Sequence, residues 1–220
     1  MHTNNTILHK IKEQGVLPLY FHPDPSVCLS VLEALYAAGI RVIEFTNRGE
    51  QALQNFARLR QAREQSMKDL VIGIGTIKTA EQARQFVAEG ADFLISPGWV
   101  PEVAEVAALH SQFYVPGCMT PTEIISAENH GATFIKLFPG HLLGPGFLSA
   151  ITDLFPRTAF MPTGGVEPER ANLEAWFKSG VVGVGMGSKL ITSAILAAGD
   201  YPKLTEETGK VLRLIKEIRG

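Results

Sequence analysis

Short runs of β-forming residues alternate along the whole chain with segments that carry apolar residues at three- and four-residue spacing. Eight such runs occur, and each is followed by a helical segment. Alternating β and α elements predict a parallel sheet, and eight units favour its closure into a (β/α)8 TIM barrel. The structural alternative is a doubly wound open sheet, which usually carries a G-x-G-x-x-G turn after its first strand, and the sequence has none there. The predicted strands are residues 16–21, 41–46, 69–76, 91–98, 113–117, 132–140, 158–165 and 181–188.

The remaining segments and the composition indicate a single folded domain with one extra helix. A further helix is expected over residues 4–14, where it would close the bottom of the barrel. No linker or low-complexity segment divides the sequence, so we expect residues 1–220 to form a single TIM-barrel domain. Charged residues make up only 19% of the chain and apolar residues 45%, which argues against disorder. The formal net charge of −2 leaves no basic excess, so no nucleic-acid partner is expected.

Cysteine and histidine usage excludes several further classes. Cys28 and Cys118 are the only cysteines and have no CxxC spacing, which makes a disulfide framework and a structural zinc site improbable. His22 and His141 follow the first and sixth runs without metal-ligand spacing, so we expect neither a metal nor another cofactor. The sequence shows no signal peptide and no apolar stretch of the roughly 20 residues that a membrane span needs. We therefore expect a cytoplasmic protein with no membrane partner.

Two charged residues lie inside predicted strands. The outer wall of a barrel strand meets apolar helices, so the side-chain period of two places Glu44 and Lys136 in the interior, near the carboxyl ends of their strands. Ile135 and Leu137 flank the lysine, and desolvation there favours the neutral amine, the form that a Schiff-base nucleophile requires. Glu44 is positioned to shuttle protons, directly or through a water molecule. The alternative is a structural Lys–Glu pair that spans the barrel.

Glycine-rich turns end the last two runs. The segments MPTGGV (161–166) and GMGSKL (185–190) both place glycines where this fold customarily binds phosphate, after strands seven and eight. We expect a phosphate or carboxylate group to bind there, although glycine is also the commonest turn residue. Six glycines are expected to let the backbone approach a ligand, namely Gly73, Gly75, Gly164, Gly165, Gly185 and Gly187.

Three polar residues complete the predicted rim of the barrel. Arg48 follows the second strand, near Glu44, and its planar guanidinium suits bidentate binding of a carboxylate. Thr76 and Thr163 stand at the ends of strands three and seven, where each offers a hydroxyl donor. Each of the three also has an ordinary structural interpretation, as a solvated surface charge or as a strand-end threonine.

Taken together and in order, several motifs closely resemble those of the KDPG/KHG aldolase family (2-dehydro-3-deoxy-phosphogluconate or 4-hydroxy-2-oxoglutarate aldolases). The resemblance runs from about residue 16 to residue 200, and it is the ordered set that makes it specific. The motifs are VIEFTNRGE (42–50), IGIGT (72–76), FLISPG (93–98), PGCMTPTE (116–123), IKLFPG (135–140), MPTGGV (161–166) and GMGSKL (185–190).

The resemblance implies a class I, metal-independent aldolase that assembles as a homotrimer of (β/α)8 barrels and cleaves a 2-oxo-3-deoxy acid to pyruvate and a short aldehyde. It implies that Lys136 forms the Schiff base and that Glu44 is the general acid/base. The implied substrate-binding residues are Arg48 and Thr76 for the pyruvate carboxylate, Pro97 and Phe138 for the pocket wall, Thr163 for the substrate hydroxyls, and Gly164, Gly165, Gly187 and Ser188 for a distal phosphate.

The chain departs from the family pattern at two points. Many members end the first strand with a basic residue, whereas this chain has LPLYFHPD, with His22 near that position. Lys189 in GSKL stands where other members often have an aromatic residue, and we expect it to add a positive charge near the phosphate turn. The reaction class is unaffected, whereas the identity of the substrate's distal group stays open.

Two other functions are compatible with the same residues. One is a phosphate-binding barrel isomerase that uses Glu44 as its base and leaves Lys136 unreacted. The other is a non-catalytic protein that binds sugar acids. A pure binding protein has no need of a buried amine, which favours the aldolase.

Overall fold

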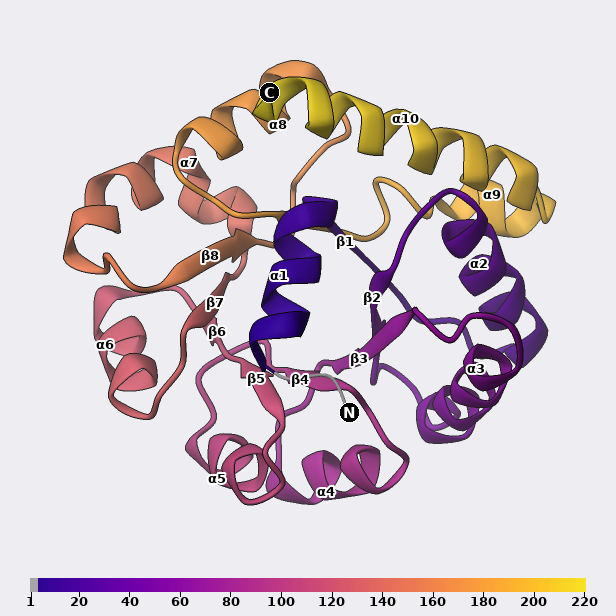
Figure 1. The fold of residues 1–220 in the computed structure, drawn as a ribbon, viewed down its shortest axis with the longest axis horizontal. Coiled ribbons are helices and arrows are strands. Elements are labelled where there is room, and N and C mark those ends of the chain that lie inside the picture. Colours follow the sequence, from indigo (N-terminus) through magenta and orange to yellow (C-terminus); the bar gives the residue numbers. More distant parts are fainter. Residues whose placement is uncertain (1–3) are drawn as a thin grey trace.

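Parallel strands form a closed barrel that a ring of helices surrounds (Figure 1), in a computed structural model that describes residues 4–220. The predicted TIM barrel with an extra N-terminal helix is therefore confirmed. The strands are β1 (Val16–Tyr20), β2 (Val42–Thr46), β3 (Val71–Gly75), β4 (Phe93–Ile95), β5 (Phe113–Val115), β6 (Gly117–Cys118), β7 (Phe134–Leu137), β8 (Ala159–Pro162) and β9 (Val184–Met186). The helices are α1 (Asn4–Gln14), α2 (Pro25–Ala37), α3 (Ala52–Ser66), α4 (Ala80–Ala88), α5 (Pro101–Leu109), α6 (Pro121–Asn129), α7 (Gly140–Ile151), the 3-10 turn Thr152–Leu154, α8 (Arg170–Lys178), α9 (Ser193–Ala198) and α10 (Tyr201–Arg219).

The fifth predicted strand is observed as two short strands on either side of Pro116. Proline has no N–H to donate to the sheet, so β5 pairs with β4 while β6 pairs with β7. The carbonyl of Pro116 still accepts a hydrogen bond of 2.9 Å from the Lys136 N–H, which carries the barrel across the break. A parallel bridge between Thr163 and Gly185 joins β8 to β9 and closes the barrel.

Several helices begin at a side chain that caps their free N–H groups. Asp24, Thr79 and Thr192 each accept a hydrogen bond from a backbone N–H in the first turn of the following helix. Thr120 and Glu123 form a capping box at the start of α6. These caps fix where the loops before α2, α4, α6 and α9 end. Within residues 4–220, no helix combines the length and the apolar character needed to cross a membrane.

Helix α1 lies across the N-terminal opening of the barrel (Figure 1). Ile7 and Ile11 are fully buried there and pack in one apolar cluster with interior residues such as Leu17, Val42 and Phe93. Burial of each such side chain contributes roughly 1.5–3 kcal/mol. The expectation that residues 4–14 close the bottom of the barrel is confirmed.

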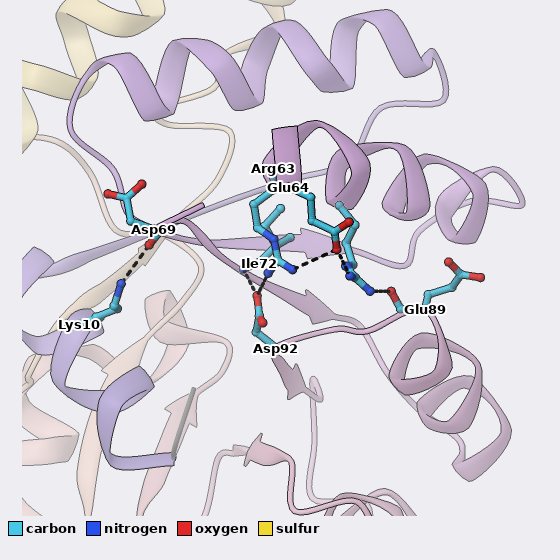
Figure 2. Close-up of polar contacts among 8 residues, drawn as sticks. Lys10, Arg63, Glu64, Asp69, Ile72, Glu89 and Asp92 are labelled. Carbon is cyan, nitrogen blue, oxygen red and sulfur yellow. Dashed lines mark hydrogen bonds and ion pairs between the residues drawn. The ribbon is translucent and has the colours of Figure 1, made fainter. Parts of the chain in front are cut away.

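Polar groups at this same end of the barrel are paired with one another (Figure 2). The Asp92 carboxylate accepts hydrogen bonds from Arg63 of α3 (2.6 Å) and from the N–H of Ile72 in β3 (2.8 Å). The Lys10 ammonium of α1 donates to the carbonyl of Asp69 at 2.9 Å. These contacts connect helices α1 and α3 to the N-terminal ends of the strands.

Candidate active site

Lys136 and Glu44 meet inside the barrel. The Lys136 Nζ lies 3.4 Å from the Glu44 Oε1, and their side chains are 6% and 1% exposed. The sheet register pairs Glu44 with Leu19 and Gly73, and Lys136 with Gly117 and Met161, so the two residues come from opposite sides of the barrel. A buried charge without a partner costs several kcal/mol, so each residue makes the presence of the other tolerable. The sequence-based placement of both side chains in the interior is confirmed.

The side chain of Glu44 occupies space that β3 leaves empty. A methyl group on Gly75 would overlap the Glu44 carboxylate, so only glycine fits beside it. Gly73 similarly faces the ring of Phe93, and Gly185 faces the side chain of Thr163. We expected these three glycines to admit a ligand, and that interpretation is wrong, because each makes room for a neighbouring side chain.

Among the buried polar atoms at the carboxyl ends of the strands, two on β2 and directly after β8 have no hydrogen-bond partner in the part of the chain that the structure describes. They are the second carboxylate oxygen of Glu44, Oε2, and the hydroxyl of Thr163. Thr163 is 4% exposed and Glu44 is fully buried. Leaving such a group unsatisfied costs about 1–3 kcal/mol, a cost that a bound substrate or water molecule would remove.

Phe138 links the lysine to the first glycine turn. The Lys136 ammonium lies 5.5 Å from the centre of the Phe138 ring, within the range of a cation–π contact. A methyl group on Gly164 would lie 3.8 Å from the same ring. The ring is half-buried, so one part of it lines the space between the lysine and the turn.

Three predicted residues stand on the rim formed by β2, β3 and β4. Arg48 is exposed, and its side chain has no hydrogen bond or ion pair with any residue in the described part of the chain. Thr76 and Pro97 are half-buried just after β3 and β4. Thr76 has a φ of 63°, a left-handed conformation that a β-branched residue rarely adopts. Such strain is found where the surrounding structure enforces it, often at binding sites.

The second half of the rim consists of the turns after β8 and β9. Gly164 and Gly165 both have positive φ values, 91° and 74°, and their N–H groups donate to no other group within residues 4–220. Gly187 and Ser188 follow β9, and Gly187 packs against Leu19 of β1. Free backbone N–H groups on two neighbouring turns are suited to binding an anion.

Lys189 does not supply a free charge to these turns. Its Nζ forms an ion pair of 2.6 Å with Glu167, which also raises the pKa of the lysine. With Asp200 and Lys203 it lines a separate cavity of about 480 Å³ beside α9 and α10. The expectation that Lys189 adds positive charge near the phosphate turn is therefore wrong.

The structure also places a residue that the sequence interpretation missed. Asn55 is 2% exposed on α3, and its amide reaches the loop between β1 and α2. Ala52, Phe56 and Leu59 are the other buried residues of this helix, at the spacing of one helical face. A polar residue on an otherwise apolar helical face is the signal that would have identified it.

Comparison with known proteins agrees with this geometry. A family model described as KDPG and KHG aldolase matches residues 7–207. The 2-dehydro-3-deoxy-phosphogluconate aldolase of Treponema pallidum (strain Nichols) is 31% identical over 96% of this chain and 98% of its own length. The KHG/KDPG aldolase of Escherichia coli (strain K12) is 32% identical over 79% of each chain.

Solved structures show the same similarity. One is a crystal structure of KDPG aldolase from Legionella pneumophila, with pyruvate captured as a covalent carbinolamine intermediate. Its TM-score against this chain is 0.85, at 29% sequence identity. The match covers 93% of this chain and 97% of that one. The barrel fold and these similarities together identify the chain as an aldolase, that is, a lyase, of the class I (Schiff-base) type. More particularly, the chain belongs to the KDPG and KHG aldolase family.

Proposed function

We propose that this chain cleaves a 2-oxo-3-deoxy sugar acid or 4-hydroxy-2-oxoglutarate to pyruvate and a short aldehyde, either glyceraldehyde 3-phosphate or glyoxylate. The observation that carries the proposal is the Lys136 amine inside the barrel, 3.4 Å from the Glu44 carboxylate. The covalent pyruvate intermediate in the Legionella relative supports it.

Lys136 is the nucleophile in this proposal. The ammonium first transfers a proton to Glu44, and the resulting amine attacks the 2-oxo carbon to give a carbinolamine. Glu44 then returns that proton to the carbinolamine hydroxyl, which leaves as water, and the product is a protonated imine that acts as a sink for electrons. The neighbouring apolar side chains Ile135 and Leu137 are fully buried, which keeps bulk water away from the strand that carries the amine.

Glu44 is the general acid and base. As a carboxylate it accepts the proton of the C4 hydroxyl while the C3–C4 bond breaks, and the bonding electrons pass to the imine to give an enamine. The aldehyde is released, the Glu44 carboxylic acid gives its proton to C3 of the enamine, and hydrolysis of the imine returns the free amine and pyruvate. Oε2 has no partner among the described side chains, so it is the oxygen available to the C4 hydroxyl or to a relaying water molecule.

The rim residues bind the two ends of the substrate in this scheme. Arg48 and Thr76 hold the carboxylate next to the reacting carbonyl, because a guanidinium and a hydroxyl both donate to carboxylate oxygens. Pro97 and Phe138 line the pocket wall. Thr163 donates to the substrate hydroxyls, and the turns with Gly164, Gly165, Gly187 and Ser188 receive the distal group, phosphate included.

The cellular and assembled form is part of the same proposal. Residues 1–220 act as a single aldolase domain in a cytoplasmic homotrimer, in line with the family resemblance. Cys28 and Cys118 are free and buried, as is common in a reducing compartment. Light scattering of the purified chain measures the assembly, and a monomeric mass would overturn the trimer.

Trapping of the imine tests the reaction type. The protein is incubated with pyruvate and reduced with borohydride, and peptide mapping by mass spectrometry locates the adduct. We expect a reduced pyruvyl adduct on Lys136 and none in Lys136→Met. Lys189→Met is the matched control, since Lys189 is exposed and outside the site, and it should be labelled at Lys136 like the wild type. An unlabelled Lys136 at saturating pyruvate would overturn the proposal.

A pyruvate-release assay coupled to lactate dehydrogenase then defines the substrate. A panel of phosphorylated and unphosphorylated 2-oxo-3-deoxy acids is compared by kcat/KM, together with 4-hydroxy-2-oxoglutarate. Pyruvate release that depends on Lys136 supports cleavage. Adduct formation without release from any member of the panel would instead indicate a protein that only binds such acids.

A further inference from the structure

A cavity of about 700 Å³, which we call the basal cavity, opens at the N-terminal end of the barrel. Residues of α1, of α10 and of the turn before β2 line it (Figure 1). It therefore lies at the end of the barrel opposite to the rim that Arg48 and the glycine turns form. Sites for small organic molecules have volumes of roughly 300–1,000 Å³, so the basal cavity has the size of a ligand site.

The charged side chains of the basal cavity are mostly cationic. Lys10, Arg41, Lys216 and Arg219 line it, and Glu13 is the one anionic side chain among its described lining residues. The side chain of Glu13 is 66% exposed and lies 3.2 Å from the ring of a histidine of α1 rather than beside one of the four cations. The whole chain has a formal net charge of −2, so this positive excess belongs to the site and not to the composition.

Two of the four cations are oriented by backbone carbonyls. Arg219 donates from Nη1 to the carbonyls of Lys12 and Glu13, at the C-terminal end of α1 (2.6 and 3.4 Å). Lys10 donates to the carbonyl of Asp69 at 2.9 Å (Figure 2). A carbonyl satisfies and orients a cation without cancelling its charge, so both side chains keep their positive charge beside the cavity.

The other two cations differ in their pairing. Arg41 forms an ion pair of 2.7 Å with the Asp69 carboxylate. Lys216 is exposed, and its side chain has no hydrogen bond or ion pair with any residue within 4–220. One of the four positive charges is therefore balanced by a carboxylate at ion-pair distance, whereas those of Lys10, Lys216 and Arg219 are not.

One face of α10 supplies both apolar and cationic contacts. Its four lining residues are spaced i, i+3, i+4 and i+7, which places them on one side of the helix, namely Leu212, Ile215, Lys216 and Arg219. Ile215 is 1% exposed and Leu212 is half-buried, so the two form an apolar wall. Each cation follows one of these apolar residues by one helical turn. A ligand that matches this face has an apolar part next to a negatively charged part.

Phosphate is the negative group that suits these donors. A guanidinium matches phosphate oxygens with its planar set of N–H groups, and an ammonium binds them as a point charge. A phosphate monoester carries about −1.5 to −2 at pH 7, which balances more of the three remaining positive charges than a single carboxylate does.

We propose that the basal cavity binds an organic phosphate. Lys216 and Arg219 contact the phosphate oxygens, and Lys10 adds a third positive charge. The apolar part of the ligand lies against Leu212 and Ile215. This site is separate from the proposed reaction, and a ligand in it contacts both α1 and α10, so it stabilises the folded chain.

Isothermal titration calorimetry of the whole chain with ADP, without divalent metal ions, tests the proposal. ADP joins a diphosphate to a flat base, whereas pyrophosphate and adenosine supply the two parts separately. We expect ADP to bind about tenfold more tightly than pyrophosphate, because only ADP also covers the apolar wall, and adenosine to bind more weakly still. The Tm should rise with the concentration of ADP.

Three variants locate the bound phosphate. Lys216→Met should weaken both ADP and pyrophosphate about tenfold, as for one lost charge-assisted hydrogen bond. Lys203→Met is the matched control, because it makes the same charge change at an exposed lysine of α10 that lines the separate cavity of about 480 Å³. It should keep the wild-type affinities. Leu212→Ser should weaken ADP and leave pyrophosphate unchanged. Borohydride trapping of pyruvate at Lys136 should be unchanged in all three variants, which shows that the barrel is folded.

The contrary outcomes are distinct. The absence of binding by both ADP and pyrophosphate at millimolar concentration would overturn the proposal. Unchanged affinity in Lys216→Met would place the phosphate elsewhere, such as at the glycine turns after β8 and β9, and would overturn it as well. Weaker binding in Lys203→Met would move the site to the cavity beside α9. Equal affinities for ADP and pyrophosphate would overturn the contact of the ligand with Leu212 and Ile215.

Discussion

Polar groups named at the two ends of the barrel differ in whether they have hydrogen-bond partners within the chain. At the N-terminal end, Asp92 is bonded to Arg63 and to a strand N–H, and Lys10 is bonded to a carbonyl (Figure 2). At the carboxyl end, Glu44 Oε2 and the Thr163 hydroxyl have no partner among the described residues. Asp92 and Lys10 are thus satisfied within the folded chain, whereas Glu44 Oε2 and the Thr163 hydroxyl need a bound substrate or water molecule.

This difference separates stability from function along the barrel axis. Groups that are satisfied within the chain stabilise it, and groups held unsatisfied or strained lower its stability in exchange for binding. Variants at the N-terminal end should therefore change stability and spare activity. Variants at the carboxyl end should lower activity, whether or not they also change stability.

Lys136→Met should have the largest effect on activity. Loss of the nucleophile is expected to lower kcat by about 10⁴-fold or more. The single variant also leaves Glu44 buried without a partner, at a cost of about 3–5 kcal/mol. In Glu44→Leu/Lys136→Met the pair is replaced by apolar groups, so we expect no activity together with stability equal to or above the wild type. Denaturant unfolding and the coupled assay measure the two properties.

A double variant less stable than Lys136→Met alone would contradict this view, because the pair would then be a net source of stability. Residual cleavage at more than about one thousandth of the wild-type rate in Lys136→Met would contradict the imine assignment.

Asp92→Ala should give the largest effect on stability among variants at the N-terminal end of the barrel. It leaves the Arg63 guanidinium, 14% exposed, and the Ile72 N–H without their acceptor. We expect the free energy of unfolding to fall by about 3 kcal/mol, with kcat and KM unchanged at temperatures where the variant is folded. Asp92→Asn keeps an acceptor for Ile72 and should lose less. A changed KM in either variant would show that the two ends are coupled.

The barrel and the interior position of its two reactive charges can be predicted from the sequence. Alternating β and α runs predict the barrel, and the rule that charges avoid the helix-facing wall places Glu44 and Lys136 inside. The side-chain period succeeds for these two residues because both lie within regular strands, β2 and β7. It fails for Thr76, which the period groups with Ile72 and Ile74, because a φ of 63° ends the extended backbone just before it.

Contacts between distant segments could not be predicted in the same way. Nothing local to Lys189 indicates that Glu167 neutralises it, because the ion pair joins loops after different strands. Asn55 is 33 residues from His22, and only the closed barrel brings α3 beside that loop. The reason for Gly75 is likewise non-local, since the space that it leaves is filled by a side chain of β2.

Thr76→Gly tests whether strain at the carboxyl end is stored for binding. A β-branched residue at positive φ costs about 1–2 kcal/mol, and glycine removes that cost while adding about 0.5–1 kcal/mol of chain entropy. We therefore expect a small net gain in the free energy of unfolding, up to about 1 kcal/mol, and a KM about tenfold higher because the hydroxyl is lost. A clear loss of stability would show that the threonine side chain stabilises the folded rim.

Tyr36→Phe should have the smallest effect and a pH signature that belongs to the N-terminal end. The Tyr36 hydroxyl donates to Asp69 at 2.7 Å and, with Arg41 nearby, lowers the pKa of that carboxyl below its ordinary value of 3.8. A lowered pKa adds stability above pH 3.8, and that stability is lost as the pH falls through the folded-state pKa. The variant should therefore melt slightly below the wild type at pH 7, and the gap should close as the pH falls below 3.8. A gap in Tm that stays constant down to pH 2.5 would mean that packing of the ring, rather than the hydrogen bond, is what the substitution disturbs. Unchanged kcat at pH 7 would again separate this end of the barrel from the chemistry at the other.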